Sequence, residues 1–90
     1  MLMLEIKYSD KASKSLKRIA KADKKIALRI IDGIETYASA PTLATNVKIL
    51  KGKFAEFKRL RIGDYRVIFD DDFNVMFVYE VKHRKEAYND

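Results

Sequence analysis

Two stretches of alternating side chains, residues 57–62 and 65–70, flank the dipeptide Gly63-Asp64 and constrain the fold more than any other feature. Alternation with a period of two is typical of half-buried strands, and a two-residue link that contains glycine is typical of a β-hairpin. A two-residue turn also fixes the register, so that Arg61 faces Arg66 and Leu60 faces Val67. The chain is therefore expected to contain one antiparallel hairpin of defined register.

This register separates the hairpin side chains into an apolar face and a basic face, because directly paired residues share a face. The apolar face is suited to packing against helices, has Lys58 at its far end, and collects Leu60, Ile62, Tyr65, Val67 and Phe69. The basic face collects Phe57, Arg59, Arg61, Arg66 and Ile68.

Two arginines that face each other on a sheet surface repel, at a cost on the order of a few tenths of a kcal/mol. A bound anion relieves this repulsion, and the guanidinium fork matches phosphate oxygens in a bidentate way. The basic face therefore predicts contact with an RNA or DNA backbone. In the alternative interpretation, Asp70, Glu80 or Glu56 neutralises the face within the fold.

The remaining elements follow from periodicity and capping. Leu2, Leu4, Ile6 and Tyr8 alternate with polar residues and predict a first strand. Two amphipathic helices follow, the first beginning after Ser9-Asp10 and the second after Asp23, because short polar side chains cap helix N-termini. Pro41 ends the second helix. Their apolar faces carry Ala12, Leu16, Ile19 and Ala20 in the first helix, and Ile26, Ala27, Ile30, Ile31, Ile34 and Tyr37 in the second.

The last part of the chain adds a third strand to the hairpin at Val75–Val81. The residues Asp71–Asn74 are expected to link it to the hairpin, so the run Asp70-Asp71-Asp72 reads as turn chemistry. Val47, Ile49 and Leu50 belong to a connecting segment, and residues 84–90 to a helical turn or a loose tail. The order is β-α-α-β-β-β in one domain, residues 1–90, which predicts an α+β fold with a mostly antiparallel sheet whose strand order stays open.

Composition excludes several classes of protein. The 90 residues include no cysteine and one histidine, so neither a disulfide framework nor a cysteine or histidine-rich metal site is expected. The absence of cysteine fits a cytoplasmic protein. The apolar start meets Glu5 too early for a signal peptide, and no window approaches membrane-spanning length. The formal charge is +6, and residues 41–66 alone carry a net +5. An acidic partner, either nucleic acid or protein, is expected.

Further basic and titratable residues accompany the hairpin. Lys48, Lys51 and Lys53 precede it, and Lys82 and Arg84 follow it. The single histidine, His83, is expected beside the basic face, as a structural hydrogen-bonding group or as a catalyst. Tyr88 lies in the polar tail, where it either anchors the tail or takes part in chemistry.

The run Phe57-Lys58-Arg59-Leu60-Arg61-Ile62-Gly63-Asp64-Tyr65-Arg66-Val67-Ile68-Phe69 resembles the core of the RelE/ParE family of toxins from toxin–antitoxin pairs. The segment Leu50-Lys51-Gly52 and the closing Val81-Lys82-His83-Arg84-Lys85-Glu86-Ala87-Tyr88 are similar to the family's corresponding segments. The resemblance implies a small β-α-α-β-β-β toxin that an acidic, RelB-like antitoxin holds inactive, and that meets operator DNA only through the antitoxin complex. RelE-like members enter the ribosomal A site and cut mRNA without a metal or cofactor, by attack of the ribose 2′-hydroxyl on the adjacent phosphate.

The resemblance also implies roles for individual residues. Arg66 matches the arginine that stabilises the transition state, Arg59 and Arg61 match basic positions of the preceding strand, and Arg84 matches the basic residue after the last strand. Tyr88 matches a catalytic tyrosine of some RelE-like members, and His83 a position where several members carry histidine. Phe57 departs from the pattern, because strongly active members can carry lysine there. The general base is thus unassigned, with Lys51 or Lys53 as substitutes from the loop.

Three functions are compatible with these features. The first is a ribosome-dependent endoribonuclease toxin, favoured because gyrase-directed relatives generally lack the terminal tyrosine that Tyr88 supplies. The second is a ParE-like inhibitor that binds DNA gyrase and cleaves nothing. The third is an inactive relative that acts only through its antitoxin.

Overall fold

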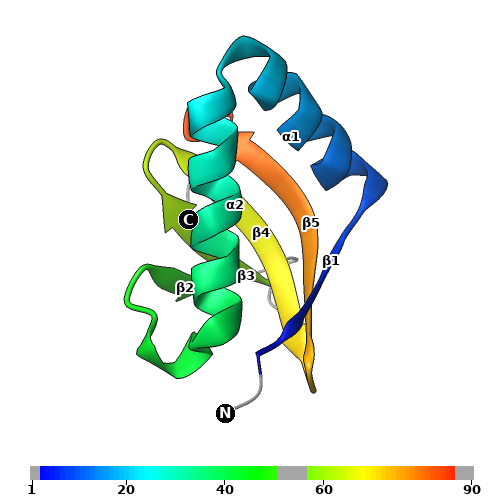
Figure 1. Ribbon diagram of the computed structural model, residues 1–90. Coiled ribbons are helices and arrows are strands. Elements are labelled where there is room, and N and C mark those ends of the chain that lie inside the picture. Colours follow the sequence, from blue (N-terminus) through cyan, green and yellow to red (C-terminus); the bar gives the residue numbers. More distant parts are fainter. Residues whose placement is uncertain (1–2, 51–56, 87–90) are drawn as a thin grey trace.

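The computed structural model describes residues 3–50 and 57–86, which form a five-stranded sheet with two helices packed on one face (Figure 1). The strands lie in the order β1-β5-β4-β3-β2, with β1 parallel to β5 and the other neighbours antiparallel. This confirms the α+β fold with a mostly antiparallel sheet and settles the strand order. The strands are β1 (Glu5–Tyr8), β2 (Val47–Ile49), β3 (Lys58–Ile62), β4 (Tyr65–Asp72) and β5 (Val75–His83).

The edge strand β2 lies where only a connecting segment was expected. It has three residues, too few for an alternating pattern to be visible in the sequence, and two of them are exposed. It pairs antiparallel with β3, with Lys48 opposite Arg59. The sheet therefore gains a strand that carries one more lysine to the basic side of the hairpin.

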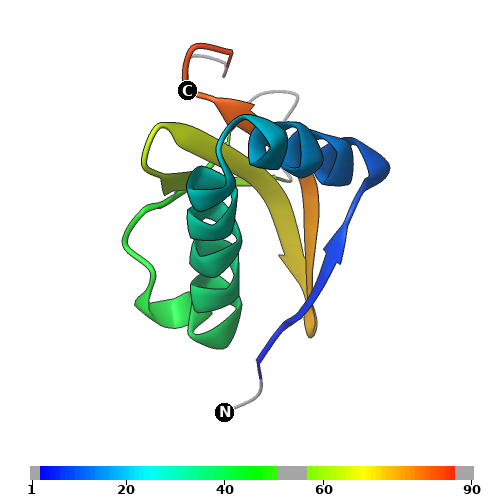
Figure 2. The ribbon, with the colours of Figure 1, turned by 45° about the horizontal axis from the view of Figure 1, so that its top comes forward.

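The two helices, α1 (Asp10–Ala22) and α2 (Lys24–Ser39), begin at the predicted caps and lie on the same side of the sheet (Figure 2). The Ser9 hydroxyl accepts a hydrogen bond from the Ala12 N–H at 3.0 Å, and the Asp23 carboxylate accepts from the Lys25 N–H at 3.0 Å. Each cap satisfies backbone donors that a helix leaves unpaired at its start. After Ala40 the chain turns through a short 3-10 helix, η1 (Pro41–Leu43), as the proline predicts.

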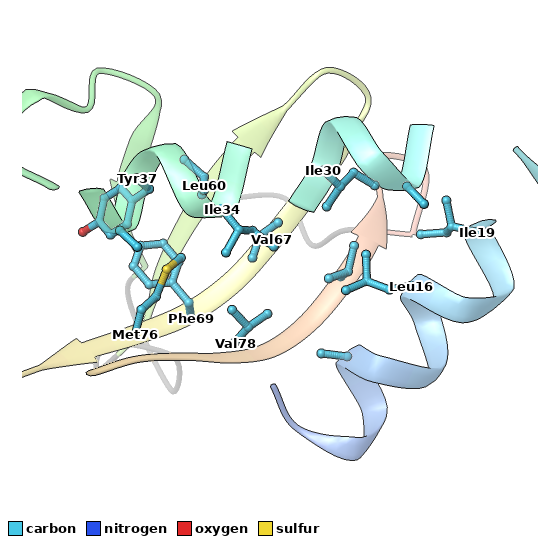
Figure 3. Packing of buried hydrophobic residues seen from close by; sticks show 14 residues of the cluster. Leu16, Ile19, Ile30, Ile34, Tyr37, Leu60, Val67, Phe69, Met76 and Val78 are labelled. Carbon is cyan, nitrogen blue, oxygen red and sulfur yellow. The ribbon is translucent and has the colours of Figure 1, made fainter. Parts of the chain in front are cut away.

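The core fills the space between the helices and the sheet (Figure 3). Tyr37 packs edge to face on Phe69 with ring centroids 4.8 Å apart. Gly33 allows α2 to approach β3 closely, since a Cβ there would lie 2.6 Å from the Ile62 side chain. The fully buried side chains come from both layers and include Ile30, Ile34, Leu60, Val67, Phe69, Met76, Val78 and Val81. In residues 3–50 and 57–86, neither helix has the length and apolar character needed to cross a membrane.

The hairpin register is confirmed at all five predicted pairs, from Lys58 opposite Phe69 to Ile62 opposite Tyr65. The next link is shorter than predicted. The strand β4 extends to Asp72, so the turn consists of Phe73 and Asn74, while β5 begins at Val75 as predicted and ends two residues later than predicted, at His83.

Asp71 consequently lies within β4, and its interpretation as turn chemistry is wrong. It accepts a hydrogen bond from the Tyr37 hydroxyl at 2.5 Å and another from the Lys58 ammonium group at 2.7 Å. A partly buried carboxylate is stabilised by donors of this kind. Asp71 thus links α2 to the far end of the hairpin's apolar face.

A β-bulge interrupts the pairing of β4 with β5. Ile68 is opposite Glu80, whereas the next residue, Phe69, is opposite Val78, so Tyr79 is the extra residue. Its carbonyl oxygen accepts a hydrogen bond from the Ser9 hydroxyl at 2.6 Å. A bulge places two consecutive side chains against one partner and redirects them. Here Tyr79 and Glu80 both reach the face without helices, while Val78 and Val81 remain in the core.

Candidate nucleic-acid interface

The sheet face without helices is turned away from the viewer in Figure 1 and carries basic side chains from four strands. We call this group the cationic face: Lys48 on β2, Arg59 and Arg61 on β3, Arg66 on β4 and Lys82 on β5. The pairing arranges them in two neighbouring rows. One row runs Arg61, Arg66, Lys82, and the other runs Lys48, Arg59, Ile68, Glu80. Paired Cα atoms on adjacent strands lie about 5 Å apart, so each row is compact.

One carboxylate, Glu80, lies in the second row and partly balances the charge. It forms ion pairs with Lys82 at 2.7 Å and with Lys11 of α1 at 3.1 Å. This agrees with the alternative interpretation as far as Glu80 is concerned. Asp70 lies on the same sheet face, two residues beyond Ile68 and opposite Phe77, and Glu56 lies outside the described residues. The two rows still hold five basic side chains and one carboxylate among the described residues. Such an excess favours an anionic occupant.

The Gly63-Asp64 turn holds two of the predicted site residues. One Arg66 guanidinium nitrogen lies 3.3 Å from the Gly63 carbonyl oxygen and donates to it. The Arg84 backbone N–H donates to the Asp64 carbonyl at 2.7 Å, and the Arg84 Nε lies 3.9 Å from an Asp64 carboxylate oxygen. The turn needs glycine because residue 63 has φ +58°. The turn therefore keeps Arg84 at the end of the hairpin, close in the fold to Arg66.

An open cleft of about 400 Å³ lies at the β2 side of the cationic face. Arg59 and Arg61 line it together with Thr45, Asn46 and Val47. The Asn46 side-chain amide donates to the Arg61 carbonyl at 2.6 Å, and the Arg61 N–H donates to the Asn46 carbonyl at 3.0 Å. The backbone that carries Arg61 is therefore fixed, while its guanidinium group is exposed. The cleft thus brings two arginines together on one wall, and guanidinium groups of this kind bind phosphate oxygens.

His83 lies on the other face of the sheet, so the expectation that it stands beside the basic face is wrong. It is opposite Tyr65, whose ring it contacts at a centroid distance of 5.2 Å. Its Nδ1 accepts a hydrogen bond from the Lys85 N–H at 3.2 Å. It lines a cleft of about 240 Å³ between the helical hairpin and the end of β5, with Arg18, Ile26 and Glu86. The sheet thus separates His83 from the cationic face.

Three of the predicted site residues, Lys51, Lys53 and Tyr88, lie outside the described residues. Elsewhere the structure places every predicted basic residue on the cationic face or at the turn beside it. No group of three His, Asp or Glu side chains within residues 3–50 and 57–86 is arranged to hold a metal ion.

The sequence reasoning missed an aromatic cluster next to the cationic face. Phe57 contacts Tyr79 edge to face at 4.8 Å between ring centroids, and Phe77 contacts Tyr79 at 4.6 Å. The hairpin register predicts Phe57 on the basic face, but it makes no prediction for the two aromatic residues of β5. The signal was hidden because the β5 sequence is apolar at both odd and even positions, so alternation alone does not show which side chains point outward.

A family model described as the ParE toxin of type II toxin–antitoxin systems matches residues 6–88. The chain belongs to this toxin family. The match spans nearly the whole sequence and confirms the resemblance to RelE/ParE toxins. No curated protein sequence matches the chain.

Solved structures of toxins share this fold at low sequence identity. The YoeB dimer from Staphylococcus aureus is 21% identical, with a TM-score of 0.75 over 91% of this chain and 98% of that chain. The archaeal RelE–RelB complex from Pyrococcus horikoshii OT3 is 24% identical, with a TM-score of 0.72 over 96% and 100%. The E. coli DinJ–YafQ toxin–antitoxin complex is 16% identical, with a TM-score of 0.72 over 98% and 100%.

Proposed function

We propose that this protein is a ribosome-dependent endoribonuclease that cuts mRNA in the ribosomal A site and thereby inhibits translation in the cytoplasm. The observation that carries the proposal is the row Arg61, Arg66, Lys82, which concentrates positive charge on an open sheet face. Lys48 and the arginine-lined cleft extend this surface, and we assign backbone phosphates to it.

The proposed reaction needs no metal ion or cofactor. The ribose 2′-oxygen forms a bond to the adjacent phosphorus, the bond from phosphorus to the 5′-oxygen breaks, and a 2′,3′-cyclic phosphate remains. Negative charge builds on the phosphoryl oxygens in the transition state, where fixed guanidinium groups stabilise it. Arg66 is the proposed stabilising group, with Arg59, Arg61 and Arg84 around it, and the loop residues Lys51 and Lys53 are proposed to add phosphate contacts.

Proton transfer accompanies this step, from the 2′-hydroxyl and to the leaving 5′-oxygen. His83 is a poor candidate because it lies on the opposite face of the sheet. We therefore propose that Tyr88 takes part at the reacting phosphate. Tyr88→Phe should then reduce mRNA cleavage in a ribosome assay strongly while leaving the thermal midpoint unchanged. A tyrosine that only packs the tail would tolerate the loss of its hydroxyl group.

The proposed partner that holds the protein inactive is an acidic, RelB-like antitoxin. The formal charge of +6 suits such a partner, and two of the solved neighbours are complexes named for a toxin and its antitoxin. We propose that operator DNA is contacted only through this complex. A short acidic protein encoded beside this chain would supply the partner for a direct binding measurement.

A second function, inhibition of DNA gyrase without cleavage, is favoured by the description of the matching family as ParE toxins. Expressing the chain alone in cells separates the two functions. The endoribonuclease should arrest growth together with protein synthesis, and primer extension should find new mRNA ends inside coding regions. Intact mRNA together with gyrase trapped in cleavage complexes would contradict the first proposal and support the second.

A further inference from the structure

The aromatic cluster of Phe57, Phe77 and Tyr79 lies on the same sheet face as the cationic face, one step further along the strands. Phe57 lies two residues before Arg59, a distance of roughly 7 Å along the strand. Phe77 is opposite Asp70, and Tyr79 is the bulged residue next to Glu80. The exposed sheet surface thus changes from basic to aromatic within two residues along the strands.

The bulge is what makes Tyr79 available on this face beside Glu80. Pairing without a bulge would send Tyr79 and Glu80 to opposite faces, because side chains alternate along a strand. The Ser9 hydroxyl binds the Tyr79 carbonyl at 2.6 Å, and the Ser9 N–H binds the Val78 carbonyl at 2.9 Å. The start of α1 therefore holds the bulge in place, and the side chain of Tyr79 is 36% exposed.

The rings of the cluster, and the lack of a net positive charge among its described neighbours, favour a base over a phosphate. Asp70 and Lys7 flank Phe77 in one row of the sheet and offset each other's charge, and Glu80 beside Tyr79 is bound by Lys82 and Lys11. A phosphate gains no net attraction from the Lys7 and Asp70 pair, whereas the flat surface of an unpaired base is attracted to aromatic rings. The neighbouring arginine rows supply the phosphate contacts that such a base requires.

We infer that Tyr79, with Phe57 and Phe77, forms a stacking subsite for one unpaired base of single-stranded RNA whose phosphate lies on the cationic face. This inference rests on the proposed function and specifies its substrate as a strand with an unstacked base beside the reacting phosphate. Single-stranded RNA is read by such aromatic platforms, since every base has a face that can stack.

The test uses ribosomes programmed with short synthetic mRNAs, in which each A-site nucleotide in turn lacks its base. Wild-type cleavage should fall about tenfold at one of these positions, because one stacked base contributes an amount of this order. Tyr79→Leu should reduce cleavage of the intact mRNA by a similar factor, with no further loss on the abasic mRNA. Tyr79→Phe keeps the ring and should cleave like the wild type.

Phe73→Leu is the matched control, because it removes an exposed ring, 93% accessible, from the β4–β5 turn outside the cluster. Unchanged cleavage by Tyr79→Leu and on every abasic mRNA would overturn the inference and leave the proposed function standing. Loss of antitoxin binding by Tyr79→Leu with unchanged cleavage would assign the cluster to the antitoxin instead. Absence of cleavage by the wild type would contradict the proposed function itself. If Tyr79→Leu fails to fold, the abasic series with the wild type decides the question.

Discussion

Arg66 occupies the centre of the first basic row, between Arg61 on β3 and Lys82 on β5. Its hydrogen bonds to the Gly63 and Tyr65 carbonyl oxygens are both 3.3 Å long, near the upper limit for such bonds. The same position relative to Arg61 makes it a source of repulsion in the absence of an anion.

Arg66→Ala should abolish growth arrest while leaving the thermal midpoint unchanged or slightly raised. The expected rise in the midpoint comes from removing one of two guanidinium groups that face each other. Residues that serve function commonly lower the stability of the fold. Growth after induction and thermal unfolding of the purified variant check the two halves of the prediction. A large drop in the midpoint would show that Arg66 is structural.

Tyr37 illustrates a buried group whose titration is linked to folding. Burial, followed by its hydrogen bond to Asp71 and the charge of that carboxylate, raises the pKa of the Tyr37 hydroxyl well above its ordinary value. An unfolded tyrosine titrates near about 10. The stability that Tyr37 contributes is therefore complete below pH 10 and is lost as the pH rises toward the folded-state pKa.

Tyr37→Phe should lower the free energy of unfolding at pH 7 by about 1–2 kcal/mol, because Asp71 loses a hydrogen-bond donor. The variant should also lose less stability than the wild type between pH 10 and pH 11.5, since residue 37 no longer titrates. Urea unfolding at both ends of this range measures the difference. Parallel pH dependence in the two proteins would contradict the linkage.

At the scale of elements, the two turns of the β3–β4–β5 meander each contain one residue with a positive φ, and that residue is different in the two turns. Gly63 has φ +58° and Phe73 has φ +54°, and both lie in the left-handed region. Glycine adopts this conformation without steric cost, whereas a side chain with a Cβ does not. Phe73 is also 93% exposed, so its ring contributes little packing there.

Phe73→Gly should therefore raise the free energy of unfolding by up to about 1 kcal/mol, and Gly63→Ala should lower it by about the same amount. A Cβ at residue 63 would lie 3.7 Å from the Arg29 guanidinium carbon, so the cost of Gly63→Ala is backbone strain and not a clash. Denaturant unfolding of both variants checks the opposite signs. Equal signs would show that the turn backbones do not control stability.

How much of the fold follows from the sequence depends on how local each signal is. The two-residue turn at Gly63-Asp64 determines its neighbours directly, so all five hairpin pairs were predicted. The bulge at Tyr79 could not be predicted in this way, because it depends on Ser9. Ser9 is distant in sequence, and its hydroxyl donates a hydrogen bond to the Tyr79 carbonyl oxygen. His83 lies on the same face of the sheet as Val81, two residues before it. The sequence does not show which face this is, because apolar residues occupy both odd and even positions of β5.

The candidate site likewise combines residues whose positions follow from local sequence with residues whose positions depend on tertiary pairing. Arg59, Arg61 and Arg66 share a face because the hairpin is local, whereas Lys48 and Lys82 join them through strands paired across the sheet. The β2 strand is short and carries no periodic signal. Its contribution to the cationic face depends on tertiary pairing, which alternation within a single segment does not reveal.

At the scale of the whole molecule, the helices cover one face of the sheet and the described residues leave the other open (Figure 2). The net charge of +6 hides an uneven distribution, since residues 67–90 carry a net −3. Two of these acidic groups, Asp71 and Glu80, form ion pairs with lysines within the fold. The basic excess is therefore directed to a surface that a nucleic acid can approach along its length.

The central claim is that RNA binds the open sheet face, and one comparison of charge reversals tests it most directly. Arg61→Glu changes an exposed residue of the cationic face, and Lys17→Glu makes the same change in net charge on the exposed side of α1. Cleavage of mRNA on purified ribosomes should be lost in Arg61→Glu and retained in Lys17→Glu. Cleavage by Arg61→Glu at the wild-type rate, or equal loss in both variants, would contradict the account.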